Sequence, residues 1–182
     1  MELIIPSPTY YRSYVDAIEE YKANHVDTYY FLDISKYDIF QRMEDFRLGR
    51  NLPPNYVKAT YLWLVEDGAF IGEVSIRHSL TEALLRYGGN IGYGVRYSAW
   101  NKGFGTIMLS KALVYAKEVV GLQKVLITCD DDNIGSARVI EKNGGKQQDT
   151  ITNVIDGRET LTRRYWIDIS TEQRHDFSSS KI

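Results

Sequence analysis

The spacing of apolar residues predicts two helices in the first third of the chain. Over residues 9–23, apolar side chains recur every three or four positions, which is the period of an amphipathic helix. The same period returns around residues 39–46, where we expect a second helix with Ser35 as its cap. Residues 49–56 contain the pair Pro53-Pro54 and are predicted to form a loop.

From residue 59 onward the period changes, and strands alternate with helices. Two hairpins are predicted, one turning at Asp67-Gly68 and the other at Asp156-Gly157. The expected strands are residues 59–66, 69–78, 89–96, 124–129, 146–155 and 158–169. The expected helical segments are a short crossing at 81–86, a long helix at 104–120 that Gly121 ends, and a helix at 134–142.

This order of segments predicts a mixed α/β (α+β) domain around one sheet. Strands 89–96 and 124–129, with the helix between them, form a right-handed parallel crossover, and the hairpins add antiparallel strands. The length of 182 residues fits one domain. We therefore expect a single domain over 1–182, with a core at 59–169 and a polar tail at 170–182.

Composition and charge narrow the class of protein. Hydrophobic residues make up 43% and charged residues 25%, as in ordinary soluble domains. A net charge of -2 gives no reason to expect a nucleic acid or a membrane as partner. The single cysteine, Cys129, excludes an internal disulfide and fits a reducing compartment. There is no apolar run of ~20 residues and no secretory signal pattern over residues 1–8, so we expect a cytoplasmic protein.

The segment 95–106 carries the clearest candidate chemistry. A predicted strand runs into a loop and then into a helix whose first turn holds Gly103 and Gly105. The first N–H groups of a helix have no partners within the helix, and glycine lets a phosphate approach them closely. Lys102 and Thr106 would add a charge and a hydroxyl. Alternatively, the two glycines serve only a tight turn and close packing of helix against sheet.

A dinucleotide site is a second reading of the same loop. Asp130 ends the next strand, roughly where an acid would bind a ribose. However, Met108 stands at the third glycine position, and both glycines come several residues after the strand. The single crossover between antiparallel hairpins also disfavours this reading.

Two linked motifs resemble the GCN5-related N-acetyltransferase (GNAT) superfamily. The cofactor loop of that family reads Gln/Arg-x-x-Gly-x-Gly/Ala; its last two positions match Gly103 and Gly105, while its first falls on Trp100. The second motif matches at Asn133, Ser136, Glu141, Lys142 and Gly144, with Ile140 in place of the usual tyrosine. More narrowly, residues 88–145, together with Arg163-Arg164-Tyr165-Trp166, look like a bacterial group known only as predicted acetyltransferases. The resemblance covers residues 59–169.

The resemblance implies a GNAT-like three-layer α/β/α sandwich whose mixed, mostly antiparallel sheet of six or seven strands has splayed central strands. It also implies acetyl-coenzyme A as co-substrate, with no metal. The pantetheine arm would insert between strands 89–96 and 124–129 and pair with the main chain at Val95 and Tyr97. The implied diphosphate contacts are the loop residues Asn101, Lys102, Gly103, Phe104, Gly105 and Thr106. Asn133 and Ser136 would reach the arm from the other side, although Asn133 also reads as a helix N-cap.

The implied reaction is direct attack of an amine on the thioester in a ternary complex, with a strand N–H near Val95 stabilising the oxyanion. Because Ile140 cannot donate a proton, Tyr93 is the candidate acid for the leaving thiolate; it also reads as a core residue. Glu73 and His78 are the candidate bases, although they also read as an exposed glutamate and a turn residue. Residues 163–166 either pack or include one side chain at the acceptor site.

Several alternatives remain open at this stage. The missing tyrosine also fits a non-catalytic acyl-coenzyme A binding protein or sensor. The acceptor is expected to be a small-molecule or peptide amine, but the sequence does not identify it. Strand edges at the late hairpin could pair across a homodimer.

Overall fold

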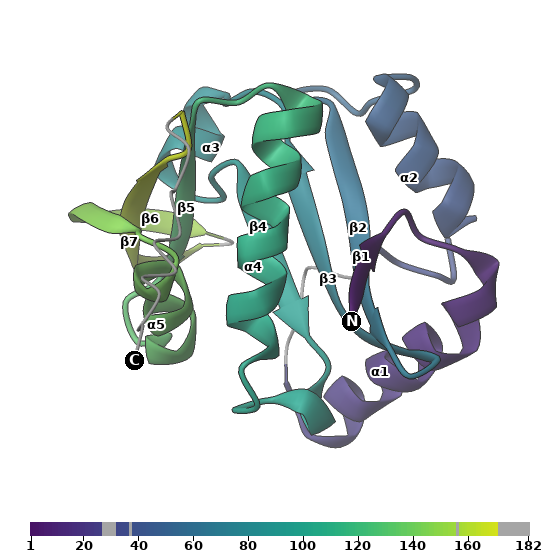
Figure 1. Ribbon diagram of the computed structural model, residues 1–182. Helices are drawn as coiled ribbons and strands as arrows, with labels where there is room; N and C mark the ends of the chain where they lie inside the picture. Colours follow the sequence, from purple (N-terminus) through teal and green to yellow (C-terminus); the bar gives the residue numbers. More distant parts are fainter. Residues whose placement is uncertain (27–31, 37, 156, 171–182) are drawn as a thin grey trace, which may run out of the picture.

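Two β-sheets form the centre of the molecule (Figure 1). This computed structural model describes residues 1–26, 32–36, 38–155 and 157–170, and these residues include seven strands. The first sheet, in spatial order, consists of β1 (Glu2–Ile4), β2 (Ala59–Glu66), β3 (Ala69–Arg77) and β4 (Ile91–Val95). The second consists of β5 (Lys124–Asp130), β7 (Arg158–Asp168) and β6 (Lys146–Ile155). All pairings within the sheets are antiparallel.

The two sheets meet at the start of β4 and then separate. The Asn90 N–H donates to the Leu126 carbonyl at 2.6 Å, and the Leu126 N–H donates to Asn90 Oδ1 at 2.9 Å. Gly89 precedes this junction with a φ of +60°, and a Cβ there would lie 2.4 Å from the Leu126 carbonyl oxygen. Beyond Asn90 the strands diverge, as the resemblance implied. The expected sheet with splayed central strands is refined in one respect, since the seven described strands form two sheets that meet at Asn90 and Leu126.

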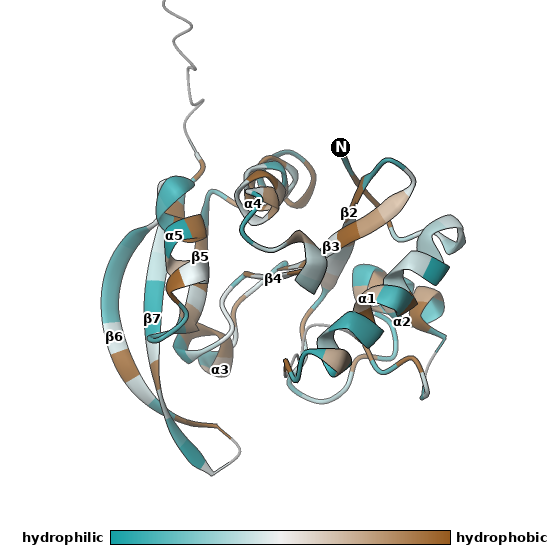
Figure 2. Cartoon of the chain, turned by 90° about the horizontal axis from the view of Figure 1, so that it is seen from below, coloured by the Kyte–Doolittle hydropathy of each residue, from teal (hydrophilic) through white to brown (hydrophobic). Residues whose placement is uncertain are grey.

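The helices cover both faces of the first sheet, as expected (Figure 2). The helical segments are a 3-10 turn (Pro8–Tyr10), α1 (Tyr11–Ala23), α2 (Ile39–Leu48), α3 (Glu82–Arg86), a 3-10 turn (Tyr97–Ala99), α4 (Phe104–Tyr115), a π-helical turn (Ala116–Val120) and α5 (Ile134–Lys142). Helices α1 and α2 pack on one face, α4 packs on the other, and α5 contacts both α4 and β5. Gly121 ends the long helix in the left-handed conformation, as predicted.

Two sequence predictions are corrected in detail. The N-cap of α2 is Asp38, whose carboxylate accepts from the N–H groups of Phe40 and Gln41, whereas Ser35 bonds to Asp33. Strand β1 was not predicted, because its three residues are too few to show a period. The tail from 171 onward and residue 156 of the second hairpin turn lie outside the described residues.

Two hydrophobic cores lie on opposite faces of the first sheet. One core contains Leu109 of α4, Ile140 of α5 and Tyr165 of β7. The other lies under α1 and α2 around Tyr14 and Trp63, whose rings stack at 4.6 Å. No helix in the described ranges is long and apolar enough to cross a membrane. With helices on both faces of its sheet, β4 forms one wall of the gap between the sheets.

Candidate active site

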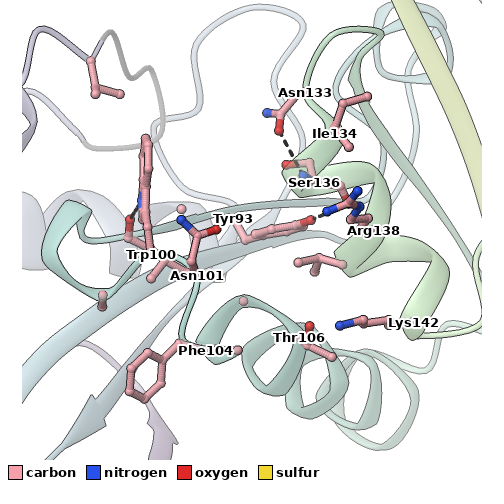
Figure 3. Close-up of a pocket in the computed structure, with 18 of the residues that line it drawn as sticks. Tyr93, Trp100, Asn101, Phe104, Thr106, Asn133, Ile134, Ser136, Arg138 and Lys142 are labelled. Carbon is pink, nitrogen blue, oxygen red and sulfur yellow. Dashed lines mark hydrogen bonds between the residues drawn. The ribbon is translucent and has the colours of Figure 1, made fainter.

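A pocket of about 690 Å³ occupies the gap where β4 and β5 separate (Figure 3). Its walls are the end of β4, the loop that leads into α4, and the face of α5 that looks toward this loop. Tyr21 and Val26, at the end of α1, also line it. The pocket is therefore bordered by α4 and α5 on one side of β4 and by α1 on the other.

The backbone of β4 turns polar groups into this gap. In an antiparallel pair, residues that exchange hydrogen bonds alternate with residues whose N–H and C=O point away from the partner strand. The Arg77 N–H donates to the Asn90 carbonyl at 2.7 Å, and the Arg96 N–H donates to the Ile71 carbonyl at 2.9 Å. Between them, Tyr93 and Val95 fall at the alternate positions of the register. Their main-chain groups consequently face away from β3 and toward β5.

The glycine loop forms the adjoining wall. Gly103 is the N-cap residue of α4 with a φ of +85°, and a Cβ added there would meet no atom within 4 Å. The left-handed backbone conformation therefore favours glycine, while the space beside it is open. Gly105 differs, because a Cβ there would lie 3.3 Å from Cγ2 of Val139 on α5. Gly103 thus leaves room beside the first N–H groups of α4, whereas Gly105 allows close packing of α4 on α5.

Helix α5 supplies the opposite wall. Asn133 is its N-cap, since Oδ1 accepts from the Ser136 N–H at 2.9 Å, and both residues line the pocket. Arg138 and Lys142, four residues apart on the same helix face, line it too, and Lys142 points toward Thr106 of α4 (Figure 3). Sequence reasoning missed these two cations as site residues. The sequence signal that could have identified them is their spacing of four residues on the predicted helix that follows the candidate anion loop.

Tyr93 extends from β4 across the pocket to α5. Its hydroxyl donates to the Ser136 carbonyl at 3.3 Å, and burial raises the pKa of this phenol. Ile140, at the position where the motif has tyrosine, is fully buried one helical turn beyond Ser136. The Tyr93 hydroxyl therefore reaches α5 one helical turn from Ile140, the position where the motif has tyrosine, but this hydroxyl belongs to β4 and not to α5.

Glu73, a candidate base, lies on the other side of the sheet, in the core under α1. It is 1% exposed, which corrects the reading of an exposed glutamate. The indole N–H of Trp63 donates to Oε2 at 2.9 Å, while Oε1 has no hydrogen-bond partner among the described residues. Burial raises the pKa of Glu73 to about 8, although the Trp63 hydrogen bond lowers it.

His78, Tyr97 and Lys102 do not line the pocket. His78 follows the end of β3 near the junction of the sheets, where its Nε2 lies 2.9 Å from Thr60 Oγ1. Burial and the charge of Lys58 lower the pKa of this imidazole. Tyr97 packs its ring against Trp100. The structure thus brings Tyr93, Val95, Asn101, Gly103, Phe104, Gly105, Thr106, Asn133 and Ser136 together at the pocket and leaves the other candidates outside it.

An ion pair fixes the loop of the pocket to α1. The Arg96 guanidinium contacts the Glu20 carboxylate, and it also donates to Ser13 Oγ at 3.1 Å and to the Phe70 carbonyl at 3.0 Å. Glu20 in turn accepts from the Ser98 N–H at 3.1 Å. Burial raises the pKa of Glu20, but the hydrogen bonds from Arg96 and Ser98 outweigh this, so that its pKa lies below the usual value. This network holds the start of the loop in place.

Comparison with known proteins identifies the family. A family model described as an acetyltransferase (GNAT) domain matches residues 16–146. The chain belongs to this GNAT family. A search of curated proteins found no match.

Solved structures agree with this GNAT assignment at the level of the fold. The microcin C7 self immunity acetyltransferase MccE, in complex with acetyl-CoA and AMP, is 18% identical, with a TM-score of 0.68 and coverage of 91% of both chains. A putative acetyltransferase, yncA, from Salmonella typhimurium with acetyl-CoA is 14% identical, with a TM-score of 0.64 and coverage of 99% of this chain and 98% of that one. A point mutant of the spermidine N-acetyltransferase SpeG from Vibrio cholerae is 16% identical, with a TM-score of 0.61 and coverage of 93% of this chain and 96% of that one. The protein is thus a GNAT acetyltransferase, and the dinucleotide reading is not retained.

Proposed function

We propose that this GNAT protein transfers an acetyl group from acetyl-coenzyme A to an amine by direct attack within a ternary complex. The observation that carries the proposal is the pocket itself. It joins the N-terminus of α4, the outward-facing backbone of β4 and the end of α1 in one space. Such a space can receive a long, phosphorylated donor on one side of β4 and an acceptor on the other.

The donor side fits a diphosphate and an extended arm. The open space at Gly103 admits an anion to the first N–H groups of α4, and the helix dipole favours negative charge there. Arg138 and Lys142 add two cations on the facing helix. The main chain at Tyr93 and Val95 offers strand-like pairing to an arm that carries amides. Acetyl-coenzyme A supplies an activated thioester, and no metal is required for its transfer.

The acceptor must be neutral before it attacks. An alkyl ammonium group with a pKa of ~10.4 has to lose its proton, to a carboxylate or to water. The Val95 N–H faces the gap and would donate to the oxygen that becomes negative during attack. The C–S bond then breaks, and the leaving thiolate takes a proton. Tyr93 is the hydroxyl in the pocket that is best placed to give that proton.

The buried Glu73 and the distant His78 are not carried forward as direct bases. Glu73 has its carboxyl in the core on the other face of β3, and His78 lies at the junction end of the sheet. We infer that the proton of the acceptor amine leaves through water in the open pocket. The acceptor is a small-molecule or peptide amine that enters from the side of α1.

A turnover assay tests the proposal. Purified protein, acetyl-coenzyme A and a panel of polyamines, amino acids, aminoglycosides and peptides are mixed, and both the released thiol and the acetylated product are measured. We expect thiol release to require one class of amine and to match the acetylated product mole for mole. Binding of acetyl-coenzyme A without transfer to any amine would favour the non-catalytic alternative.

A further inference from the structure

The Val95 carbonyl oxygen accepts two side-chain hydrogen bonds within the pocket. The indole N–H of Trp100 donates to it at 2.6 Å, and the hydroxyl of Tyr21 donates to the same oxygen (Figure 3 shows the Trp100 bond). A carbonyl oxygen has two lone pairs, so these two donors use its full capacity. The oxygen nevertheless faces the gap in which the proposed function places the arm of the donor.

The two donors are held to different degrees. Tyr21 is 5% exposed and belongs to the core-facing side of α1. Trp100 is 42% exposed and lies in the loop between a 3-10 turn and the start of α4. Among the described aromatic residues, its ring lies 6.2 Å from the ring centre of Tyr21 and 4.8 Å from that of the exposed Tyr97. Moving Trp100 therefore costs much less buried surface than moving Tyr21.

We propose that the Trp100 indole is a displaceable cap on β4, which leaves the Val95 carbonyl when a ligand with an amide-bearing arm pairs with this strand. The inference rests on the proposed function, because it takes the arm to lie along β4. Trp100 stands where the family motif has glutamine or arginine, so the cap belongs to this chain and not to the motif. Displacing the indole lowers the binding affinity of ligands that possess the arm, but it does not affect the affinity of the nucleotide part alone.

Nuclear magnetic resonance of the indole N–H groups observes the displacement directly. All three indoles donate hydrogen bonds: Trp63 to Glu73, Trp100 to Val95, and Trp166 to Gln148. On saturation with acetyl-coenzyme A, we expect the Trp100 N–H to exchange with solvent at least severalfold faster, while the other two keep their rates. 3′-Phospho-ADP, which lacks the arm, should leave all three unchanged. Unchanged or slower exchange at Trp100 with acetyl-coenzyme A would overturn the proposal.

Calorimetry of two matched variants provides the second measurement. Trp100→Phe keeps a ring but removes the donor, and Trp166→Phe makes the same change outside the pocket. We expect Trp100→Phe to bind acetyl-coenzyme A about three- to tenfold more tightly, the net worth of one hydrogen bond no longer broken on binding. The affinity of Trp100→Phe for 3′-phospho-ADP should stay within about twofold of the parent. Trp166→Phe should bind both ligands within the same limit, a change smaller than the net contribution of one hydrogen bond.

The outcomes separate this inference from the function on which it rests. If the parent binds acetyl-coenzyme A but Trp100→Phe binds it equally or more weakly, the cap is refuted and the proposed function stands. If the variant binds both ligands more tightly, Trp100 acts on the diphosphate loop and the cap is again refuted. If the parent binds neither ligand, both proposals fail.

Discussion

At the scale of single residues, the site shows two departures from its family motif that lie on opposite sides of one strand. Ile140 removes a hydroxyl from α5, and Trp100 places an indole beside the Val95 carbonyl. The Tyr93 side chain extends from β4 to α5, where its hydroxyl donates to the Ser136 carbonyl. A role that the family assigns to one helix is thus open to a residue on the neighbouring strand.

Replacing Tyr93 with phenylalanine should lower kcat without changing the affinity for the donor. A general acid is worth about 10²–10⁴ in rate, and a thiol pKa of ~8.5 allows some unassisted departure, so we expect a loss of about ten- to a thousandfold. Backbone contacts of the donor survive the change, so Kd from calorimetry should remain the same. Tyr97→Phe, which removes a hydroxyl outside the pocket, is the matched control. Parent-like kcat in Tyr93→Phe would leave this tyrosine with a packing role only.

The residues of the site were predictable to different degrees, for physical reasons. Gly103 was found because glycine at the start of a helix lets a phosphate approach the backbone, and its left-handed φ in the structure fits this residue type. Lys142 and Arg138 were missed because two cations four residues apart are common on any exposed helix face. The burial of Glu73 was not predicted. Its burial depends on α1 and α2, which are distant in sequence and cover that face of the sheet.

At the scale of elements, the proposed anion site is shared by α4 and α5. The N-terminus of α4 and the cations of α5 approach the same volume, and Gly105 lets the two helices pack closely. The boundaries of α5 and of β2 and β6 were predicted to the residue, because capping residues and hairpin turns mark them. The junction of the two sheets has no such mark, because it depends on a hydrogen bond between the Asn90 side chain and the backbone of Leu126, which are distant in sequence.

Replacing Lys142 with glutamine should weaken donor binding by about tenfold, which is the lower range for a hydrogen bond to a charged group, since solvent reaches this side chain. The loss should shrink as the salt concentration rises. The Kd for acetyl-coenzyme A, measured at about 0.05 M and about 0.5 M salt, checks the size of the loss and its salt dependence. The Debye length changes about threefold between these two concentrations. Lys117→Gln, in the π-helical turn that follows α4, is the control and should bind as the parent does. Equal losses at both salt concentrations would argue against an electrostatic role for Lys142.

At the scale of the whole molecule, two cores on opposite sides of the first sheet carry the fold, and one of them contains a carboxyl group. Glu73 lies in the core under α1, beside Trp63, and its proximity contributes to the raised pKa of Tyr14, for which burial is the main cause. The folded protein therefore favours a protonated Glu73, whereas the unfolded chain releases this proton near the ordinary pKa of 4.5. Global stability is thereby linked to pH through a group outside the pocket.

The sign of this linkage gives a prediction. Between pH 4.5 and about 8 the folded state holds a proton that the unfolded state has lost, so the contribution of Glu73 to stability falls as pH rises through that range. Glu73→Gln keeps an oxygen for Trp63 and cannot ionise, so its unfolding free energy in urea should fall less from pH 5 to pH 8 than that of the parent. Glu66→Gln, at a partly exposed position of β2, should keep the parental slope. Identical slopes for parent and Glu73→Gln would show that the carboxyl does not hold its proton in the fold.

The junction at Asn90 also relates the angle between the two sheets to the width of the pocket. The two sheets are hydrogen-bonded to each other at Asn90 and Leu126, and β4 runs on from there to Val95. Five residues of strand make an arm of about 16 Å. A tilt of about ten degrees at the junction would therefore shift Val95 by about 3 Å over an arm of that length. We therefore predict that Asn90, which is not among the described residues that line the pocket, helps to set the width of the gap at Val95 through its bond to Leu126, and that substitution of Asn90 changes which acyl chains fit.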